Sequence, residues 1–569
     1  MEKNYYNESR KFYLNQIDLR DIVEYLENNY ENEGPDALHS YEEAQEWYEM
    51  VLKNAGDISA NFIEPRAEDV DAEGCTLENG QVSWTEPTKK NMEILTKAGF
   101  MGGTLDRKYG GLNLPITINN AIVEMVSQAD ASLMNLFGLQ DIAVTISKFG
   151  SEEQKDRVLP KFCKGEVSGS MALTEPDAGS DLQAVELKAI KEDGQWYLDG
   201  VKRFITNGCG DVSLVLARSE EGSKSGRGLS MFLYERYRDD NLTIRRIEDK
   251  LGIHGSPTCE LQFDMAKTEL VGRRRFGLIK YVMDLMNGAR LAVSAQAQGI
   301  AQAAFNEAVD YANEREQFGK KIVEFPAVYQ MLKKMEAEVE TSRLLLYQTC
   351  YYVDKKEMYE EKKADGEKVR DELKEYKAKA DLLTPLTKFV TTEMANQVAY
   401  DALQIHGGCG FMKDFPVERL YRDARITNIY EGTTQLQVVA ALGGIKSGVL
   451  DGEFEEFKNM DVKNPDFTTD HVFICNYIDE YQKLVTAIKE LESKEFFDYV
   501  GNYVVELLSI VDRLVLLFPI VLEHNEKAEL FRFYLNESDT RINYLINKVN
   551  KLMNTYGKDI GNLKNNFVE

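Results

Sequence analysis

The sequence predicts an α+β fold in which a helical part, a β part and a second helical part follow one another along the chain. Apolar residues recur at helical spacing up to about residue 166 and again after residue 276. Between 167 and 271 they occur in alternating, β-branched runs separated by glycine turns. With 569 residues, 43% hydrophobic and 10% aromatic, the chain can bury a large core and is not a disordered polymer.

The first two segments are expected to be helical. Residues 1–84 form a helical extension, in which Ile22, Val23 and Leu26 recur at helical spacing. Residues 85–166 form an N-terminal helical domain. It is interrupted by the loop GGTLDRKYGGLNLP, whose four glycines and final proline predict irregular backbone.

The later segments are a middle β domain at 167–275, a helical bundle at 276–450 and a C-terminal helical extension at 451–569. The runs QWYLDGVKRFIT, VSLVLAR and LSMFLYE are typical of strands. The segment Asp354–Ala380 is so charged that it predicts a solvated helix or a helical hairpin. The apolar stretch Val504–Leu522 contains charges and a proline, so a buried helix is expected there instead of a membrane anchor.

Charge and cysteine content exclude several classes of protein. The formal net charge of −27 repels phosphate backbones and anionic lipids, so neither nucleic acid nor membrane insertion is expected. The seven cysteines show no C-x-x-C pair, which argues against a disulfide framework and a metal site. The chain start mixes both charge signs and lacks the apolar core of a signal peptide, so we expect a cytoplasmic protein.

Four segments combine glycines, small residues and polar groups where regular structure should be interrupted. They are MALTEPDAGSDL (171–182), YLDGVKRFITNG (197–208), EREQFGKKIVEFPAV (314–328), and QIHGGCGF followed by RDARITNIYEGTTQLQ (404–437). Taken singly, each is typical of a turn or a helix cap. Together and in this order, from about Asn91 to Leu442, they resemble the acyl-CoA dehydrogenase family of flavoproteins.

The resemblance implies a fold as well as a family branch. It implies a helical N-terminal domain, a β-barrel-like middle domain and a C-terminal helical bundle, here with helical extensions. The segments EDKLGIHGSPTCELQFD (248–264) and LMNGARLAVSAQAQG (285–299) look most like the large bacterial branch that includes 3-methylmercaptopropionyl-CoA dehydrogenases.

By this resemblance the reaction is FAD-dependent α,β-dehydrogenation of an acyl-CoA thioester, with the hydride passing to flavin N5. The residue that matches the family's base is Glu431, expected to be kept dry by Ile429 and Tyr430, because a desolvated glutamate gains proton affinity. The other interpretation of Glu431 is an ordinary carboxylate at a helix N-terminus. Ala289 occupies the base position of the isovaleryl and long-chain branches, and Glu175 is expected to have a structural role.

The resemblance also assigns binding residues. FAD would contact Met171, Leu173, Thr174, Phe204, Ile205, Thr206, Thr433 and Gln435. A neighbouring subunit would bind the same cofactor through Arg315, Phe318, Gln404, Gly407 and Gly408. The thioester would contact Ser180, Asn287, Arg290 and Gly432. Phe204 stands where the family commonly has tryptophan. A cofactor that spans an interface implies a homo-oligomer, and the C-terminal extension favours a dimer over a tetramer.

Other functions on the same fold remain open. The expected electron acceptor is an electron-transfer flavoprotein, but dioxygen would make the protein an acyl-CoA oxidase, and reversal would make it an enoyl-CoA reductase. A DNA-associated or non-catalytic assembly flavoprotein is the alternative outside metabolism. The charge of −27 argues against the DNA-associated protein, and an intact Glu431 argues against the non-catalytic assembly protein.

Overall fold

The computed structural model describes residues 3–34 and 37–566, and its chain forms two compact units. Unit 1 comprises Met1–Glu8, Arg20–Ala303 and Met412–Thr427. Unit 2 comprises Ser9–Leu19, Ala304–Phe411 and Asn428–Glu569. The predicted α+β class is confirmed, whereas the five-part division of the chain stays a prediction.

The N-terminal segment is helical except for one hairpin that the sequence analysis missed. Its helices are α1 (Glu8–Leu14), α2 (Arg20–Leu26), α3 (Tyr41–Ile58) and α4 (Ala67–Glu73). Strands β1 (Thr76–Glu78) and β2 (Gln81–Ser83) then pair around Asn79 and Gly80, which both have positive φ. An Asn-Gly pair in this conformation is the turn that matches the twist of a two-stranded ribbon.

The second helical block lies between residues 86 and 163. It consists of α5 (Glu86–Lys97), α6 (Ile116–Ala129), α7 (Ala131–Phe137), α8 (Ile142–Phe149) and α9 (Glu152–Cys163). Ser151 and Gln154 form a capping box that begins α9. The glycine-rich loop is irregular as predicted. It folds back on itself, because the N–H groups of Leu112 and Leu114 donate to the carbonyls of Gly102 and Gly103.

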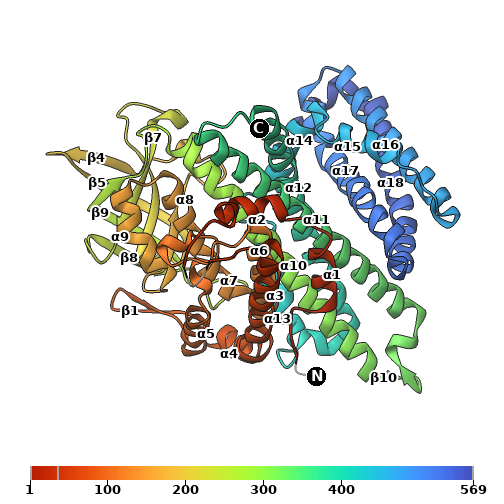
Figure 1. Cartoon of the computed structure of the whole chain (residues 1–569), viewed down its shortest axis with the longest axis horizontal. Coiled ribbons are helices and arrows are strands. Elements are labelled where there is room, and N and C mark those ends of the chain that lie inside the picture. Colours follow the sequence, from red (N-terminus) through yellow and green to blue (C-terminus); the bar gives the residue numbers. More distant parts are fainter. Residues whose placement is uncertain (1–2, 35–36, 567–569) are drawn as a thin grey trace. The chain divides into compact units, whose positions relative to one another are not determined.

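The β part of unit 1 is one barrel-like sheet (Figure 1). Its strands are β3 (Gly169–Ala172), β4 (Lys188–Glu192), β5 (Gln195–Thr206), β6 (Val212–Arg218), β7 (Leu229–Glu235), β8 (Leu242–Ile247) and β9 (Thr258–Leu270). Pairing runs β6-β4-β5-β9-β7, and the additional pairing of β7 with β6 closes the ring. Closure removes the exposed edges that an open sheet would leave.

Both faces of β6 are buried, which explains its continuous apolar run. Val212, Leu214 and Leu216 pack with residues of α8 and α9, while Val215 and Ala217 lie in a separate core inside the sheet. A strand covered on both faces loses the alternation of polar and apolar residues.

Three long helices and two shorter helices carry most of the remaining motifs. Helix α10 (Met283–Glu314) runs from unit 1 into unit 2. In unit 2, α11 (Pro326–Ala364) and α12 (Arg370–His406) form the predicted helical hairpin, and α14 (Thr434–Ser447) packs on α12. Helix α13 (Val417–Thr427) belongs to unit 1, where Arg422 binds both carboxylate oxygens of Asp71.

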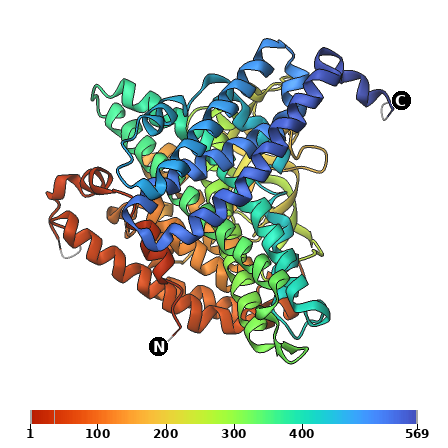
Figure 2. The ribbon, with the colours of Figure 1, turned by 90° about the vertical axis from the view of Figure 1, so that its right-hand side faces the viewer.

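The C-terminal extension contains α15 (Asp451–Lys458), α16 (Pro465–Glu490), α17 (Lys494–Glu523) and α18 (Ala528–Tyr556). Figure 2 shows the last three helices, in blue, side by side. Helix α17 packs closely on α14, since a Cβ at Gly501 would lie 3.0 Å from Val438. Arg513 joins α17 to α11 through Glu338 at 2.7 Å. In the described part of the chain, no helix has the length and apolar character needed to cross a membrane.

Candidate functional site

In unit 1, two hydrogen bonds fasten the segment after β3 to the end of β5. The Lys202 ammonium donates to the carbonyl of Leu173 at 2.8 Å, and the N–H of Arg203 donates to the carbonyl of Thr174 at 2.9 Å. The structure thereby brings the candidate residues of the two segments together. They are Met171, Leu173 and Thr174 on one side and Phe204, Ile205 and Thr206 on the other.

A bulge in β5 aims Phe204 outward. The register of β5 with β9 shifts between Lys202 and Ile205, and Phe204 lies in the left-handed region with φ +60°. Its ring is 52% exposed, whereas Ile205 is buried and Thr206 pairs with Thr258. Bulges re-aim side chains near functional sites, and a non-glycine residue at positive φ is strained. The bulge therefore presents an aromatic face to solvent at the end of the strand.

Glu175 has the structural role that the sequence analysis expects. Its carboxylate is buried and accepts hydrogen bonds from the N–H groups of Glu186 and Leu187 at 2.7 and 2.9 Å. It also pairs with the fully buried Lys202 at 2.9 Å. Burial lowers the pKa of Lys202 to about 8, and the neighbouring Glu175 opposes that shift. These partners occupy the carboxylate of Glu175.

The three candidate substrate residues of unit 1 differ in their surroundings. Ser180 is exposed, and it is Asp181 that caps the following turn by accepting from the N–H of Gln183. Arg290 is buried on α10 and donates to Asn287 at 3.0 Å, one helical turn earlier. The structure thus holds Arg290 and Asn287 as a pair.

In unit 2, the residues assigned to the far end of the cofactor are exposed. Phe318 is 94% exposed with φ +53°, and Arg315, Gln404, Gly407 and Gly408 also face solvent. Gly407 has φ +59°, and a Cβ there would meet no atom within 4 Å.

His406 lies in the helix end just before these glycines. It is buried and stacked on Tyr311 with ring centroids 4.2 Å apart, and burial lowers its pKa. His406 is therefore a packed residue of the helix end.

Glu431 lies on a strained turn before α14. Glu431 and Gly432 have consecutive positive φ values of +54° and +91°. The Glu431 side chain is half-buried, and Thr433 is the N-cap of α14 without a side-chain capping bond. Gln435 is exposed in the first turn of α14. Ile429, expected to exclude water, is 42% exposed in the single chain, so this part of the expectation is corrected.

Three residues missed by the sequence analysis hold this turn. Lys388 on α12 donates to the carbonyls of Tyr430 and Gly432, and Gln437 on α14 donates to those of Glu431 and Gly432. Glu393 accepts from Asn428 at 3.0 Å and from the hydroxyl of Thr434. The sequence contained one indication that Lys388 binds a specific partner, because it is the single charged residue in the run LLTPLTKFVTT at 382–392.

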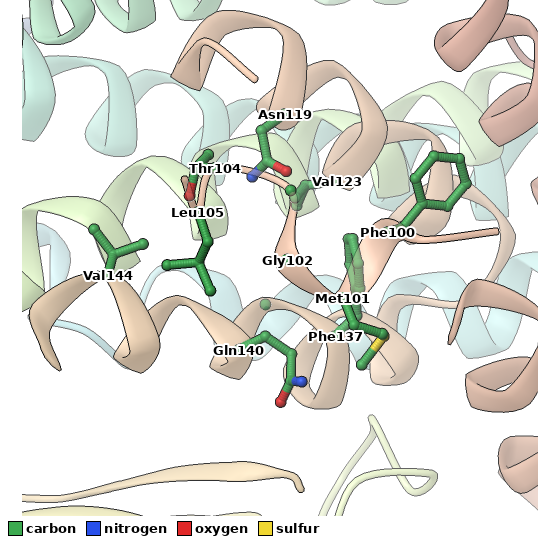
Figure 3. A pocket seen from close by; sticks show the side chains of 12 residues that line it. Phe100, Met101, Gly102, Thr104, Leu105, Asn119, Val123, Phe137, Gln140 and Val144 are labelled. Carbon is green, nitrogen blue, oxygen red and sulfur yellow. The ribbon is translucent and has the colours of Figure 1, made fainter. Parts of the chain in front are cut away.

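A small cavity lies beside the glycine-rich loop in unit 1 (Figure 3). It is lined by the loop and by α6, α7 and α8, including Met101, Leu105, Asn119, Phe137, Gln140 and Val144. Its volume of about 10 Å³ is enough for about one water molecule. As it stands, the cavity does not hold an organic ligand.

Comparisons with known proteins agree with this architecture. Residues 45–166, 170–266 and 279–441 match the N-terminal, middle and C-terminal domains of acyl-CoA dehydrogenases. The chain is 35% identical to 3-methylmercaptopropionyl-CoA dehydrogenase from Ruegeria pomeroyi, over 75% of this chain and 76% of the relative. It is 33% identical to 3-(aryl)acrylate reductase from Clostridium sporogenes, over 69% of this chain and 96% of the relative.

Solved structures give the same result. Butyryl-CoA dehydrogenase from Megasphaera elsdenii is 31% identical with a TM-score of 0.60, over 70% of this chain and 97% of that one. A chain from a structure of the electron transferring flavoprotein of Acidaminococcus fermentans has the same identity and TM-score, over 72% and 98%. An acyl-CoA dehydrogenase with FAD from Bacillus anthracis shares the fold over 92% and 91%, with a TM-score of 0.75 and 22% identity.

The fold and these matches define an oxidoreductase that acts on acyl-CoA thioesters. The chain belongs to the acyl-CoA dehydrogenase family.

Proposed function

We propose that this protein dehydrogenates an acyl-CoA thioester between the α and β carbons, with Glu431 as the base that removes the α proton. The observation that carries the proposal is the turn at 430–432. It places the only carboxylate of the IYEGTTQ motif at a strained, half-buried position. Its three consecutive backbone carbonyls accept hydrogen bonds from the side chains of Lys388 and Gln437. Strain of this kind is retained where function needs a fixed geometry.

The residues of the β part fit FAD. Phe204 offers an exposed aromatic face to a flat ring, and the neighbouring Thr206 adds a hydroxyl donor. Leu173 and Thr174 are tied beside them by Lys202 and Arg203. When bound, FAD would supply the acceptor for the hydride that leaves the β carbon.

The far end of the cofactor would be held by the exposed group in unit 2. Arg315 supplies a planar fork of donors for pyrophosphate, and Gly407 and Gly408 allow close approach of phosphate to backbone N–H groups. Phe318, Gln404, Thr433 and Gln435 complete the proposed set. Arg315, Phe318, Gln404, Gly407 and Gly408 are all exposed on the single chain, which is consistent with a cofactor that they bind from a second copy.

On the substrate, this chain's own groups would fix the thioester and stabilise the charge that develops on its oxygen. The N–H of Glu431 is the proposed donor to that oxygen, a contribution of the oxyanion-hole type. Ser180 and the Asn287–Arg290 pair would contact the CoA ester, while Gly432 leaves room beside it.

The reverse direction is a second candidate. Two relatives are named as reductases, 3-(aryl)acrylate reductase and acryloyl-CoA reductase (NADH) from Anaerotignum propionicum, the latter 33% identical over 69% of this chain and 92% of the relative. The same residues would then deliver a proton to the α carbon. An electron-transfer flavoprotein is the proposed electron partner in either direction, and the cytoplasm the proposed location.

The test is a screen of acyl-CoA thioesters against the FAD-loaded protein without oxygen. The proposal predicts that at least one saturated acyl-CoA bleaches the flavin absorbance and yields the 2-enoyl-CoA. The reductase would be favoured if no saturated thioester bleaches the flavin and an enoyl-CoA reoxidises the chemically reduced protein. Rapid reoxidation of the reduced protein by air would favour the oxidase.

A further inference from the structure

We propose that Lys388, assisted by Gln437, is a positioning residue that holds the Glu431 turn in its strained conformation; this rests on the proposed role of Glu431. Lys388 is fully buried in α12, forty-three positions before Glu431 in the sequence. Its ammonium donates to the carbonyl of Tyr430 at 2.8 Å and to that of Gly432 at 2.7 Å. The cation therefore binds the turn on both sides of Glu431.

Gln437 completes the contact from the first turns of α14. Its side-chain amide donates to the carbonyl of Glu431 at 3.2 Å and to that of Gly432 at 2.8 Å. Three successive carbonyls are thus bound by two side chains from different helices. We name this arrangement the carbonyl clamp, consisting of Lys388, Gln437 and the carbonyls of residues 430–432.

The clamp explains why a non-glycine residue tolerates the left-handed conformation. Glu431 has φ +54°, and such a residue persists only where the surroundings over-determine it. Hydrogen bonds to a charged donor are about twice as strong as neutral ones, which makes a lysine more effective here than a neutral side chain. Glu393, which accepts from Asn428 and Thr434, anchors the same segment on the N- and C-terminal sides of the turn.

The clamp also explains why a buried cation is retained in α12. A buried ammonium is costly unless polar groups surround it, and the backbone carbonyls of the turn supply two of those partners. A lysine that served packing alone would be replaceable by methionine of similar size. We infer that the charge is kept because it fixes the backbone beneath the base.

Two measurements on FAD-loaded protein test the inference. Lys388→Met should speed amide hydrogen exchange in the segment 428–437 at least tenfold, while exchange in the C-terminal half of α12 stays unchanged. Flavin reduction by the best acyl-CoA should slow by about 10²-fold with little change in KM, because misplacement by about 1 Å is enough for such a loss. Lys388→Arg, which keeps a cation, should recover part of the rate.

Lys379→Met is the matched control, since Lys379 lies on the same helix but pairs with Glu375 and Glu453. It should leave both measurements at the wild-type values. If Lys388→Met does not fold, Gln437→Met removes two of the four bonds and should change both readouts in the same direction.

Wild-type exchange in segment 428–437 of a folded Lys388→Met protein would overturn the inference, and so would wild-type reduction kinetics. If no acyl-CoA reduces the wild-type flavin, the proposed function fails instead, and the exchange measurement alone still decides whether Lys388 holds the turn.

Discussion

Two non-glycine residues in the left-handed conformation carry the proposed chemistry. Phe204 is turned outward by a bulge in β5, and Glu431 sits on the turn bound by the carbonyl clamp. In both cases nearby lysines, Lys202 and Lys388, donate to backbone carbonyls of the adjoining segment. Each unit therefore uses a buried ammonium to fix irregular backbone where a side chain of the proposed site is presented.

The buried pair Glu175–Lys202 gives a prediction about stability. Glu175→Gln should lower the free energy of unfolding by about 3 to 5 kcal/mol, because the loss of one partner leaves the other buried and unpaired. The exposed neighbour Asp177→Asn should leave it nearly unchanged. Denaturant unfolding measures both, and equal stability of the two variants would contradict the structural role of Glu175.

The sequence predicted single residues only where a motif named them. Glu431, Phe204 and Thr206 follow from recognisable segments. The clamp could not be predicted because Lys388 and the turn are distant in sequence, and helical periodicity does not report which backbone a buried lysine binds.

At the scale of elements, long periodic segments were predicted well and short ones were not. The runs QWYLDGVKRFIT, VSLVLAR and LSMFLYE, predicted as strands from local periodicity, coincide with β5, β6 and β7. The hairpin β1–β2 was missed because each strand has three residues, too few for alternation to stand out, although Asn79-Gly80 marks its turn. The barrel closure through β6 and β7 came from the family resemblance alone.

Helix α17 provides a pH-dependent prediction. Asp512 is buried there, and burial, with repulsion from Glu453, raises its pKa from 3.8 to about 8. Between these values the folded state keeps a proton that the unfolded chain has lost. The contribution of Asp512 to the free energy of unfolding is therefore fully present below about pH 4. It falls as the pH rises towards 8, by up to about 1.4 kcal/mol per pH unit.

Asp512→Asn should remove that component, so the variant's thermal midpoint should exceed that of wild type by an amount that grows from pH 4 to pH 8. Asp498→Asn, at an exposed position on the same helix, serves as the control. A wild-type pH profile in Asp512→Asn would show that Asp512 does not carry this dependence.

At the scale of the whole molecule, the extension packs on the helical bundle of unit 2. Helix α17 contacts α14 through Gly501 and contacts α11 through Arg513, and Lys527 at the start of α18 pairs with Glu340 of α11. These contacts cover faces of α11 and α14 that a chain without the extension would expose. This supports the hypothesis of a dimer in place of a tetramer.

Light scattering after size-exclusion chromatography tests that hypothesis on the FAD-loaded protein. The expected mass is about twice the 64.8 kDa of one chain. Proteolysis between α14 and α16, followed by the same measurement, should expose the covered face and increase the mass of the assembly. A tetramer of the intact chain would contradict the hypothesis.

The central claim is that the Glu431 carboxylate removes the α proton. The most direct measurement is the rate at which an acyl-CoA thioester bleaches bound FAD in Glu431→Gln, with Glu455→Gln, an exposed position in unit 2, as the control. The account predicts that Glu431→Gln retains its yellow cofactor and slows by about 10²- to 10⁴-fold, while the control behaves as wild type. Bleaching of Glu431→Gln at the wild-type rate would contradict the account.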